Sequence, residues 1–374
     1  MPFCYSPWTN LDINPQGTLS PCCKFQLTHY KEKYNVQTDT VVEYINSDFL
    51  KQIRDEFQQD QWPVGCQRCK IEEQNNIASK RQLDYQRWEE HYSKVNLESS
   101  KFLTASVAFG NTCNLKCITC NSVSSSKWHR EYLEVYNTDF RPVHFYRKDF
   151  VSGFVSQVPD LLHLDIPGGE PLLSGVSEQK QLLQHYVDIG KSKEISIHYT
   201  TNASIFPDNS WIDLWKHFRE VEIQLSIDGI GARYEYIRYP ANWEELQKNA
   251  RLYIELEKVQ NNIRLSVSHT VSAYNILYIP EFLDWCQTTG LPEPWLGRVH
   301  NPVHMRPEVW PATVRQFIQQ TLTQDSNKIS QTWGKLLDQD NSDHFDNFIK
   351  YTHIHDRNRG LNFSLVFSEL AQFI

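Results

Sequence analysis

The sequence contains no apolar run long enough to cross a membrane. No stretch of its 374 residues approaches the roughly 18 consecutive apolar residues that a bilayer-spanning helix needs. The first residues, Met-Pro-Phe-Cys, also lack the basic and apolar regions of a signal peptide. We therefore expect a cytoplasmic protein with no membrane partner.

The chain also lacks an excess of positive charge. Lysine and arginine number 37 against 45 aspartates and glutamates, which gives a formal net charge of -8. Nonspecific binding to nucleic acid needs a basic surface, because Lys and Arg neutralise the phosphates. We expect no nucleic-acid partner. With 40% hydrophobic and 22% charged residues, the composition is that of a folded globular protein, and it excludes disordered and collagen-like chains.

Cysteine is present in an uneven distribution. Eight of the nine cysteines fall in the first third of the chain, and only Cys286 lies outside it. In a reducing compartment, clustered cysteines indicate metal binding more than disulfides. The clustered residues are Cys4, Cys22, Cys23, Cys66, Cys69, Cys113, Cys117 and Cys120.

Beyond residue 101 the pattern alternates between strands and helices. The predicted strands are 103–109, 161–166, 195–201, 221–227, 263–270 and 295–302. The predicted helices between them are 124–136, 177–189, 210–219, 242–258 and 275–288. This alternation is typical of an α/β fold with parallel strands. Six strand–helix units are too few for a complete eight-stranded barrel, so we expect a partial (β/α)6 TIM-like barrel.

The predicted strands alternate polar and apolar residues. In 221–227, for example, Val221 and Ile223 share one face, while Glu222 and Gln224 take the other. Strands covered by helices on both faces are instead near-continuous apolar runs. The polar faces are therefore expected to converge on a lumen that can hold a ligand. The alternative is antiparallel strands with a solvated face, which the helix-length connections disfavour.

These patterns predict three domains. Residues 1–98 form a cysteine-rich module with turn signals and a helical connector, 99–305 form the partial barrel, and 306–374 form a helical C-terminal extension. Within the extension, the segment 353–356 (His-Ile-His-Asp) is interpreted as solvated rather than metal-binding.

One cysteine loop follows the first barrel strand directly. Cys113, Cys117 and Cys120 have the spacing C-x3-C-x2-C. Three thiolates on one short loop can hold three irons of a 4Fe–4S cluster and leave the fourth iron open. The alternative on spacing alone is a zinc site, with His129 as a further ligand.

With the motifs that follow the next strands, this loop resembles the radical S-adenosylmethionine (radical SAM) superfamily. Residues 168–171 (Gly-Gly-Glu-Pro) end the second strand, 201–202 (Thr-Asn) the third, and 226–229 (Ser-Ile-Asp-Gly) the fourth. All lie where such barrels place their sites, at the C-terminal ends of the strands. The resemblance covers about residues 101–300. Many members carry an aromatic residue just before the third cysteine, where this chain has Thr119.

The resemblance implies a 4Fe–4S cluster on Cys113, Cys117 and Cys120, whose open iron binds SAM. The Gly-Gly-Glu residues would meet the methionine ammonium. Polar residues after the third and fourth strands would contact the ribose and methionine. An arginine fork would suit the SAM carboxylate, with a surface ion pair as its alternative role. The residues so assigned are Gly168, Gly169, Glu170, Asn202, Ser226, Asp228 and Arg238.

The N-terminal cysteines resemble the auxiliary-cluster module called twitch, a half-length relative of the SPASM domain. Cys4 and Cys22 frame a glycine in the pattern C-x12-G-x4-C, and Cys66 and Cys69 form a C-x2-C pair. In this family the module usually follows the barrel, whereas here it precedes it. Four cysteines would fully ligate an auxiliary 4Fe–4S cluster, which favours electron transfer. A structural zinc ribbon is the alternative. Cys23 is not needed as one of the four ligands.

The function implied is reductive cleavage of SAM to a 5′-deoxyadenosyl radical, abstraction of a substrate hydrogen, and uptake of an electron by the auxiliary cluster. His198 and Asp165 are the catalytic candidates, because the alternation directs them into the lumen. A reducing donor such as flavodoxin or ferredoxin is the expected partner.

Two classes of substrate fit these motifs. One is a peptide or protein side chain, which the frequency of such substrates among the relatives favours. The other is a small hydroxylated molecule such as a sugar, aminocyclitol or nucleoside. A non-catalytic zinc-binding interaction protein is the alternative outside the enzymes.

Overall fold

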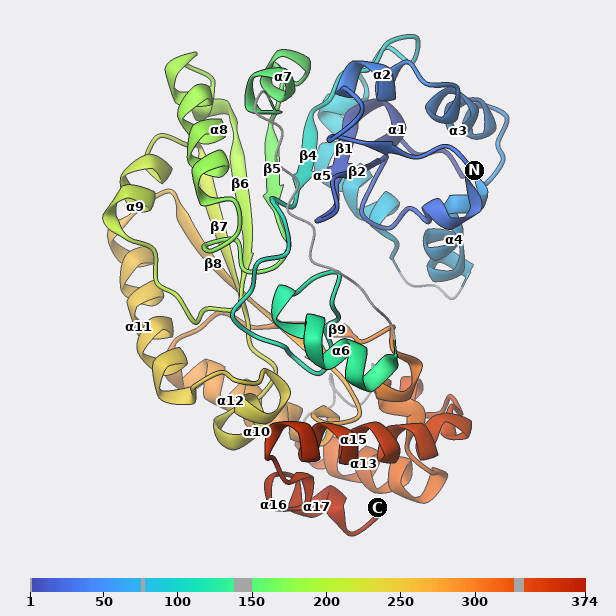
Figure 1. Cartoon of the computed structure of the whole chain (residues 1–374), viewed down its shortest axis with the longest axis vertical. Coiled ribbons are helices and arrows are strands. Elements are labelled where there is room, and N and C mark those ends of the chain that lie inside the picture. Colours follow the sequence, from blue (N-terminus) through green and yellow to red (C-terminus); the bar gives the residue numbers. More distant parts are fainter. Residues whose placement is uncertain (1, 75–77, 138–149, 326–332) are drawn as a thin grey trace. The chain divides into compact units, whose positions relative to one another are not determined.

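The structure is a computed structural model that describes residues 2–74, 78–137, 150–325 and 333–374 (Figure 1). The chain divides into two compact units. Unit 1 comprises Met1–Thr112, Val143–Tyr199 and Pro207–Val221, and unit 2 comprises Cys113–Pro142, Thr200–Phe206 and Glu222–Ile374.

Unit 1 contains strands in the order β3-β2-β1-β4-β5-β6. The pairs β1–β4, β4–β5 and β5–β6 are parallel, and the pairs β1–β2 and β2–β3 are antiparallel. The last two residues of β6 belong to unit 2. The strands are β1 (Asn10–Ile13), β2 (Thr18–Ser20), β3 (Tyr34–Asn35), β4 (Thr104–Val107), β5 (His163–Ile166) and β6 (Ser196–Thr201).

The strands β1 to β3 differ from the turns that the sequence predicts for the first 70 residues. Each has only two to four residues, so the alternation that reveals longer strands has too few positions to show. The turn signal between β1 and β2 is nevertheless real, because the Gly17 amide donates to the Asn14 carbonyl over 2.8 Å. Parallel pairing with β4 is a long-range contact that no local pattern reports.

The helices of unit 1 begin at recognisable caps. The Ser79 side chain accepts from the Gln82 amide at the start of α5, and Ser47 caps α3 in the same way. Trp88 and Tyr92 of α5 are buried against Leu103. Helix α8 packs between α7 and α9, as Figure 1 shows. The helices are α1 (Ser6–Thr9), α2 (Val41–Ile45), α3 (Asp48–Gln58), α4 (Gln67–Gln74), α5 (Lys80–Tyr92), α7 (Phe150–Gln157), α8 (Val176–Asp188) and α9 (Asn209–Trp215).

Unit 2 contains β7 (Glu220–Ser226, from its third residue), β8 (Ile263–Val271) and β9 (Trp295–Arg298), in that order. β8 and β9 are parallel. The predicted alternation is confirmed, since Leu265 and Val267 are buried while Ser266 and Ser268 are partly exposed. The mixed α/β class with parallel strands is confirmed as well.

The C-terminal helices of unit 2 enclose its main core. Trp310 and Phe348 are fully buried there with Tyr274, and Figure 1 shows these helices gathered near the C-terminus. The helices of unit 2 are α6 (His129–Tyr136), α10 (Gly231–Ile237), α11 (Trp243–Val259), α12 (Ile279–Thr289), α13 (Ala312–Asp325), α15 (Phe345–Arg359), α16 (Phe363–Val366) and α17 (Ser368–Ala371). Across the described ranges, every helix is too short or too polar to span a membrane.

Candidate functional site

The cysteine loop of unit 2 is held by backbone hydrogen bonds to the last residue of α10 and to the segment that follows it. The Lys116 amide donates to the Tyr239 carbonyl and the Ile118 amide donates to the Ile237 carbonyl, both over 2.7 Å. The Ile118 side chain is buried in the core of unit 2. These contacts anchor the loop on both sides of Cys117.

The three thiols of this loop lie close enough to influence one another electrostatically. Burial raises the pKa of Cys117 to about 11 and that of Cys120 to about 12, and the neighbouring thiols act in the same direction. Arg238 opposes this rise, and its Nη1 lies 4.0 Å from the Cys117 Sγ. By their chemistry, three partly buried thiols beside a fixed cation are suitable ligands for an anionic iron–sulfur cluster. The described residues contain no group of three or more His, Cys, Asp or Glu side chains that could hold a metal ion.

Arg238 lies in a buried ion pair rather than in the surface pair considered above. Its Nε lies 2.8 Å from the Asp228 Oδ2, and the two residues are 8% and 0% exposed. Burial alone would lower the pKa of Arg238, but Asp228 and the adjacent cysteines together raise it. Asp228 also accepts from the Thr270 amide over 2.7 Å. Asp228 thus holds the positively charged guanidinium of Arg238 beside the cysteine loop.

Two further predicted residues of unit 2 take different partners. Asn202 donates through Nδ2 to the Asn114 Oδ1 over 2.9 Å, and the same atom lies 3.8 Å from the Cys113 Sγ. Ser226 instead lies 3.3 Å from the Ser268 hydroxyl on the neighbouring strand. The structure therefore brings Asn202 to the cysteine loop and places Ser226 on the polar face of β7.

The Gly-Gly-Glu turn of unit 1 needs its glycines. Gly168 and Gly169 have φ of 93° and 54°, and a Cβ on Gly169 would stand 2.3 Å from the Thr112 carbonyl oxygen. The amide of Glu170 donates to the same carbonyl over 2.8 Å. Glu170 is fully buried, and its Oε1 accepts from the Leu172 amide. The close backbone approach leaves no room for a side chain at position 169.

A row of polar residues crosses the parallel strands of unit 1. The register pairs Asp12 with Ser106, Ser106 with Asp165, and Asp165 with His198. His198 Nδ1 lies 2.7 Å from the Asp165 Oδ1, and the Ser106 hydroxyl donates to the Asp165 Oδ2 over 3.2 Å. Burial would raise the pKa of Asp165, but His198 holds it below its usual value. The two predicted catalytic residues thus form one hydrogen-bonded pair.

This polar row faces a cavity of ≈ 200 Å³ beneath helix α5. Lys80 and Asp84 of α5 form an ion pair of 2.7 Å at its edge. The lining residues are Asn10, Cys23, Lys80, Asp84, Arg87, Trp88, Thr104, Ala105, Ser106, His163, Asp165 and His198. The sequence pattern predicts only a polar helical connector in the region of α5. Its charged residues recur at i, i+4 and i+7 behind a capping box, a spacing that places them on one helix face and that could have indicated their role.

The four N-terminal cysteines of the predicted auxiliary site are partly or fully buried, whereas Cys23 is exposed. Burial raises the pKa values of Cys4, Cys22 and Cys66, and the pKa of each is raised further by at least one neighbouring cysteine. Cys69 is buried at the start of α4. Cys23 instead lines the polar cavity.

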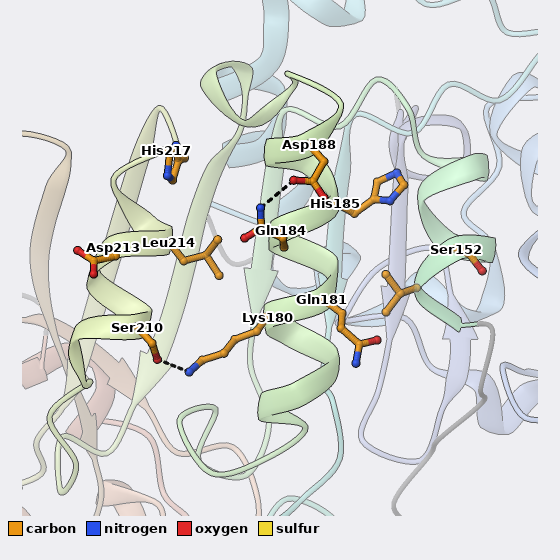
Figure 2. Close-up of a pocket in the computed structure, with 11 residues that line it drawn as sticks. Ser152, Lys180, Gln181, Gln184, His185, Asp188, Ser210, Asp213, Leu214 and His217 are labelled. Carbon is orange, nitrogen blue, oxygen red and sulfur yellow. Dashed lines mark hydrogen bonds between the residues drawn. The ribbon is translucent and has the colours of Figure 1, made fainter.

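A second hollow lies on unit 1 between α8 and α9, with a volume of ≈ 770 Å³ (Figure 2). Lys180 donates to the Ser210 hydroxyl, and Gln184 to the Asp188 carboxylate, across its wall. No predicted site residue lines this hollow. Of the two hollows on unit 1, only the cavity beneath α5 contains the predicted catalytic residues.

The N-terminal cysteines fall within a known family pattern. Residues 4–70 match the SPASM model, described as an iron–sulfur cluster-binding domain. This range contains Cys4, Cys22, Cys66 and Cys69. No curated protein matches the chain.

Solved structures with similar folds were also found. AdoMet-bound native anSMEcpe is 16% identical with a TM-score of 0.43, covering 54% of this chain and 53% of its own. Streptococcus suis SuiB bound to S-adenosylmethionine is 15% identical with a TM-score of 0.41, covering 84% and 69%. The methyltransferase TsrM from Kitasatospora setae is 12% identical with a TM-score of 0.37, covering 52% and 35%. The chain thus spans about half the length of the anSMEcpe chain.

The buried Asp12 carboxyl predicts a pH-dependent stability. Burial raises the pKa of Asp12 to about 6 from 3.8, although hydrogen bonds from Ser20 and Ser106 oppose the rise. A raised pKa means that the stabilising contribution is complete below pH 3.8 and is lost as pH rises through 6. Asp12→Asn should therefore stabilise the fold at pH 8 by about 1–3 kcal/mol and give no gain at pH 3.5.

Urea unfolding at both pH values measures this difference. The matched control is Asp213→Asn, whose side chain is 67% exposed and which should change stability little at either pH. If Asp12→Asn is no more stable than the parent at pH 8, the ionised Asp12 carboxylate does not destabilise the folded state.

Proposed function

We propose that this chain, a radical SAM protein with a SPASM iron–sulfur module in its first 70 residues, cleaves SAM reductively and oxidises a substrate. The observation that carries the proposal is the loop of Cys113, Cys117 and Cys120. The loop is anchored by backbone hydrogen bonds, and Arg238 lies beside it. The SPASM match adds an independent iron–sulfur signature in the same chain.

In this proposal the cysteine loop holds the 4Fe–4S cluster that binds SAM, and Cys4, Cys22, Cys66 and Cys69 hold the auxiliary one. When bound, the two clusters and SAM supply a low-potential electron, a 5′-deoxyadenosyl radical and an electron acceptor. The SAM-binding residues proposed on the family pattern are Gly168, Gly169, Glu170, Asn202, Ser226, Asp228 and Arg238. In these roles the turn at 168–170 approaches SAM through its backbone, and Arg238 provides a fixed positive charge.

The Asp165–His198 pair provides the proton chemistry of the proposed reaction. Oxidation of a C–H bond removes a hydrogen atom, an electron and a proton, so a group beside the substrate must take the proton. His198 can accept it, because Asp165 stabilises the imidazolium that forms at a contact of 2.7 Å. Ser106 orients Asp165 in turn.

We propose that the substrate is a side chain of a peptide or protein. The cavity beneath α5 is ≈ 200 Å³, which accommodates one polar side chain. The alternative, a small hydroxylated molecule, is favoured by the same lining, because Thr104, Ser106 and Asp165 offer hydroxyl and carboxylate partners to a polyol. Addition of each class to the reconstituted enzyme distinguishes them, since only a true substrate changes the rate of 5′-deoxyadenosine formation.

The remaining assignments follow from this proposal. The parallel strands form a partial (β/α)6 barrel over residues 99–305, between an auxiliary module at 1–98 and a helical extension at 306–374. A donor such as flavodoxin or ferredoxin delivers the electron. Oxygen-sensitive clusters require a reducing compartment, which favours the cytoplasm.

Iron analysis tests the proposal directly. The anaerobically reconstituted chain should contain about eight irons and eight sulfides, the content of two cubane clusters. Replacing Cys113, Cys117 and Cys120 with Ala should halve the iron and abolish 5′-deoxyadenosine formation. Replacing Cys66 and Cys69 should also lower the iron but leave SAM binding intact. If the parent chain contained zinc and no sulfide, the proposed radical SAM activity would be excluded.

Gly169→Ala should weaken SAM binding without removing the clusters. The new methyl group would collide with the Thr112 carbonyl, and the alanine would be strained at a φ of 54°. Equilibrium dialysis should show roughly tenfold weaker SAM binding at unchanged iron content. Gly190→Ala is the matched control, because Gly190 also has a positive φ, of 73°, but has open space around it. Equal effects of the two substitutions would show that backbone strain alone is responsible.

Asp165→Asn should separate the radical step from the proton step. The amide keeps the shape but cannot stabilise the imidazolium of His198, so substrate oxidation should fall by about 10²-fold. Formation of 5′-deoxyadenosine without substrate should stay within about twofold of the parent rate. Product and 5′-deoxyadenosine are measured together by chromatography. Unchanged product formation between pH 6 and 9 would remove the pair from the mechanism.

A further inference from the structure

A buried carboxylate in unit 2 gathers basic side chains from two distant segments of the chain. Glu131 of α6 is 4% exposed. It forms ion pairs with Lys116 of the cysteine loop and, over 2.7 Å, with the Arg359 Nε, and the His355 Nδ1 lies 3.4 Å from its Oε1. Burial would raise the pKa of Glu131, but these partners hold it at about 2, so the carboxylate is ionised. We call Lys116, Glu131, His355 and Arg359 the Glu131 cluster.

The Glu131 cluster corrects the sequence interpretation of the tail. The segment 353–356 was predicted to be solvated, but His355 is 0% exposed and its ring lies 5.7 Å from that of Trp128. Helix α15 turns this side chain inward together with Arg359, which lies four residues later on the same face.

Arg359 is a buried cation with little hydrogen bonding. Its side chain is 0% exposed, and among the described residues Nη1 and Nη2 have no hydrogen-bond partner. The guanidinium instead lies 4.8 Å from the Trp128 ring and 5.4 Å from the Tyr239 ring. Two aromatic faces and one shared carboxylate are a weak compensation for a desolvated guanidinium. Its positive field is therefore only partly neutralised.

The two aromatic residues around Arg359 also hold the cysteine loop. The Trp128 indole donates to the Cys117 carbonyl over 2.9 Å. The Tyr239 carbonyl accepts from the Lys116 amide, and the Lys116 Nζ lies 5.2 Å from the Tyr239 ring. Every group that positions Arg359 thus has a second contact with the segment around Cys117.

The charges of the Glu131 cluster do not balance. Lys116 and Arg359 are positive, Glu131 is negative, and burial lowers the pKa of His355 so that its ring is neutral near pH 7. One positive charge remains, in a buried setting where electrostatic interactions are weakly screened. A cluster on three thiolates gains negative charge on reduction, so a nearby fixed cation favours the reduced state.

We propose that Arg359 is a positioning residue for the catalytic centre, holding the cysteine loop from the C-terminal helix α15 and raising the reduction potential of the cluster bound there. The inference rests on the proposed function, because it requires a cluster on Cys113, Cys117 and Cys120. It gives the helical extension a role in SAM cleavage that its sequence does not suggest.

The test uses the reconstituted holoenzyme, with EPR-monitored redox titration as the readout. Arg359→Gln should keep its iron and sulfide but shift the reduction potential to more negative values and slow 5′-deoxyadenosine formation roughly tenfold at a fixed potential. Arg359→Lys keeps the charge and should restore most of the potential. Arg357→Gln is the matched control, because Arg357 is exposed on the same helix, and it should leave the potential unchanged.

The opposite charge change tests the electrostatic part separately. Glu131→Gln removes a negative charge and should shift the potential to more positive values, whereas a purely structural role would not reverse sign. If Arg359→Gln cannot hold its iron, the shift in Glu131→Gln decides the question. The inference is overturned if a cluster-containing Arg359→Gln variant has the reduction potential of the parent, or if Glu131→Gln does not shift that potential. Either result would leave the proposed function intact. A parent chain without a 4Fe–4S signal overturns the proposed function.

Discussion

The register of the parallel strands in unit 1 is the constraint on which the candidate chemistry depends. Side chains alternate along a strand, so a slip of one residue would turn every polar group to the opposite face. The register pairs Asp165 directly with His198 and continues through Ser106 to Asp12. The apolar alternate positions, such as Leu164 and Ile197, are fully buried. Burial of the apolar face therefore determines where the polar row lies.

In unit 2 the main constraint is that charged side chains lie beside partly buried thiols. Arg238 has Asp228 as its partner, and Lys116 and Arg359 share Glu131. Removing one member of such a pair leaves an uncompensated buried charge, which costs far more than the intact pair. Three cationic side chains therefore lie near the cysteine loop, and replacing any one of them should destabilise unit 2. They are Arg238, Lys116 and Arg359. This arrangement suits a centre that carries negative charge.

Much of the fold could be predicted because long strands and helices carry their own periodicity. The helix expected at 242–258 is observed at Trp243–Val259, and the strand expected at 263–270 at Ile263–Val271. The short strands β1 to β3 could not be found in this way, because each has only two to four residues, and β1 pairs with β4, which lies some ninety residues away in the chain. The cysteine motifs were visible at once, since a ligand loop is a local pattern. Arg359 was not, because its carboxylate partner is 228 residues away.

The sequence by itself determined the α/β class, the alternating polar faces and the cysteine spacings, since each is set by neighbours along the chain. Only the tertiary structure decided which charges are buried together. Arg238 could have been a surface residue, and His355 was expected to be one, yet both are enclosed. A side chain's burial depends on what packs over it, and the segments that cover the Glu131 cluster lie more than two hundred residues apart in sequence. That long-range packing, rather than any motif, gives these residues their electrostatic effect.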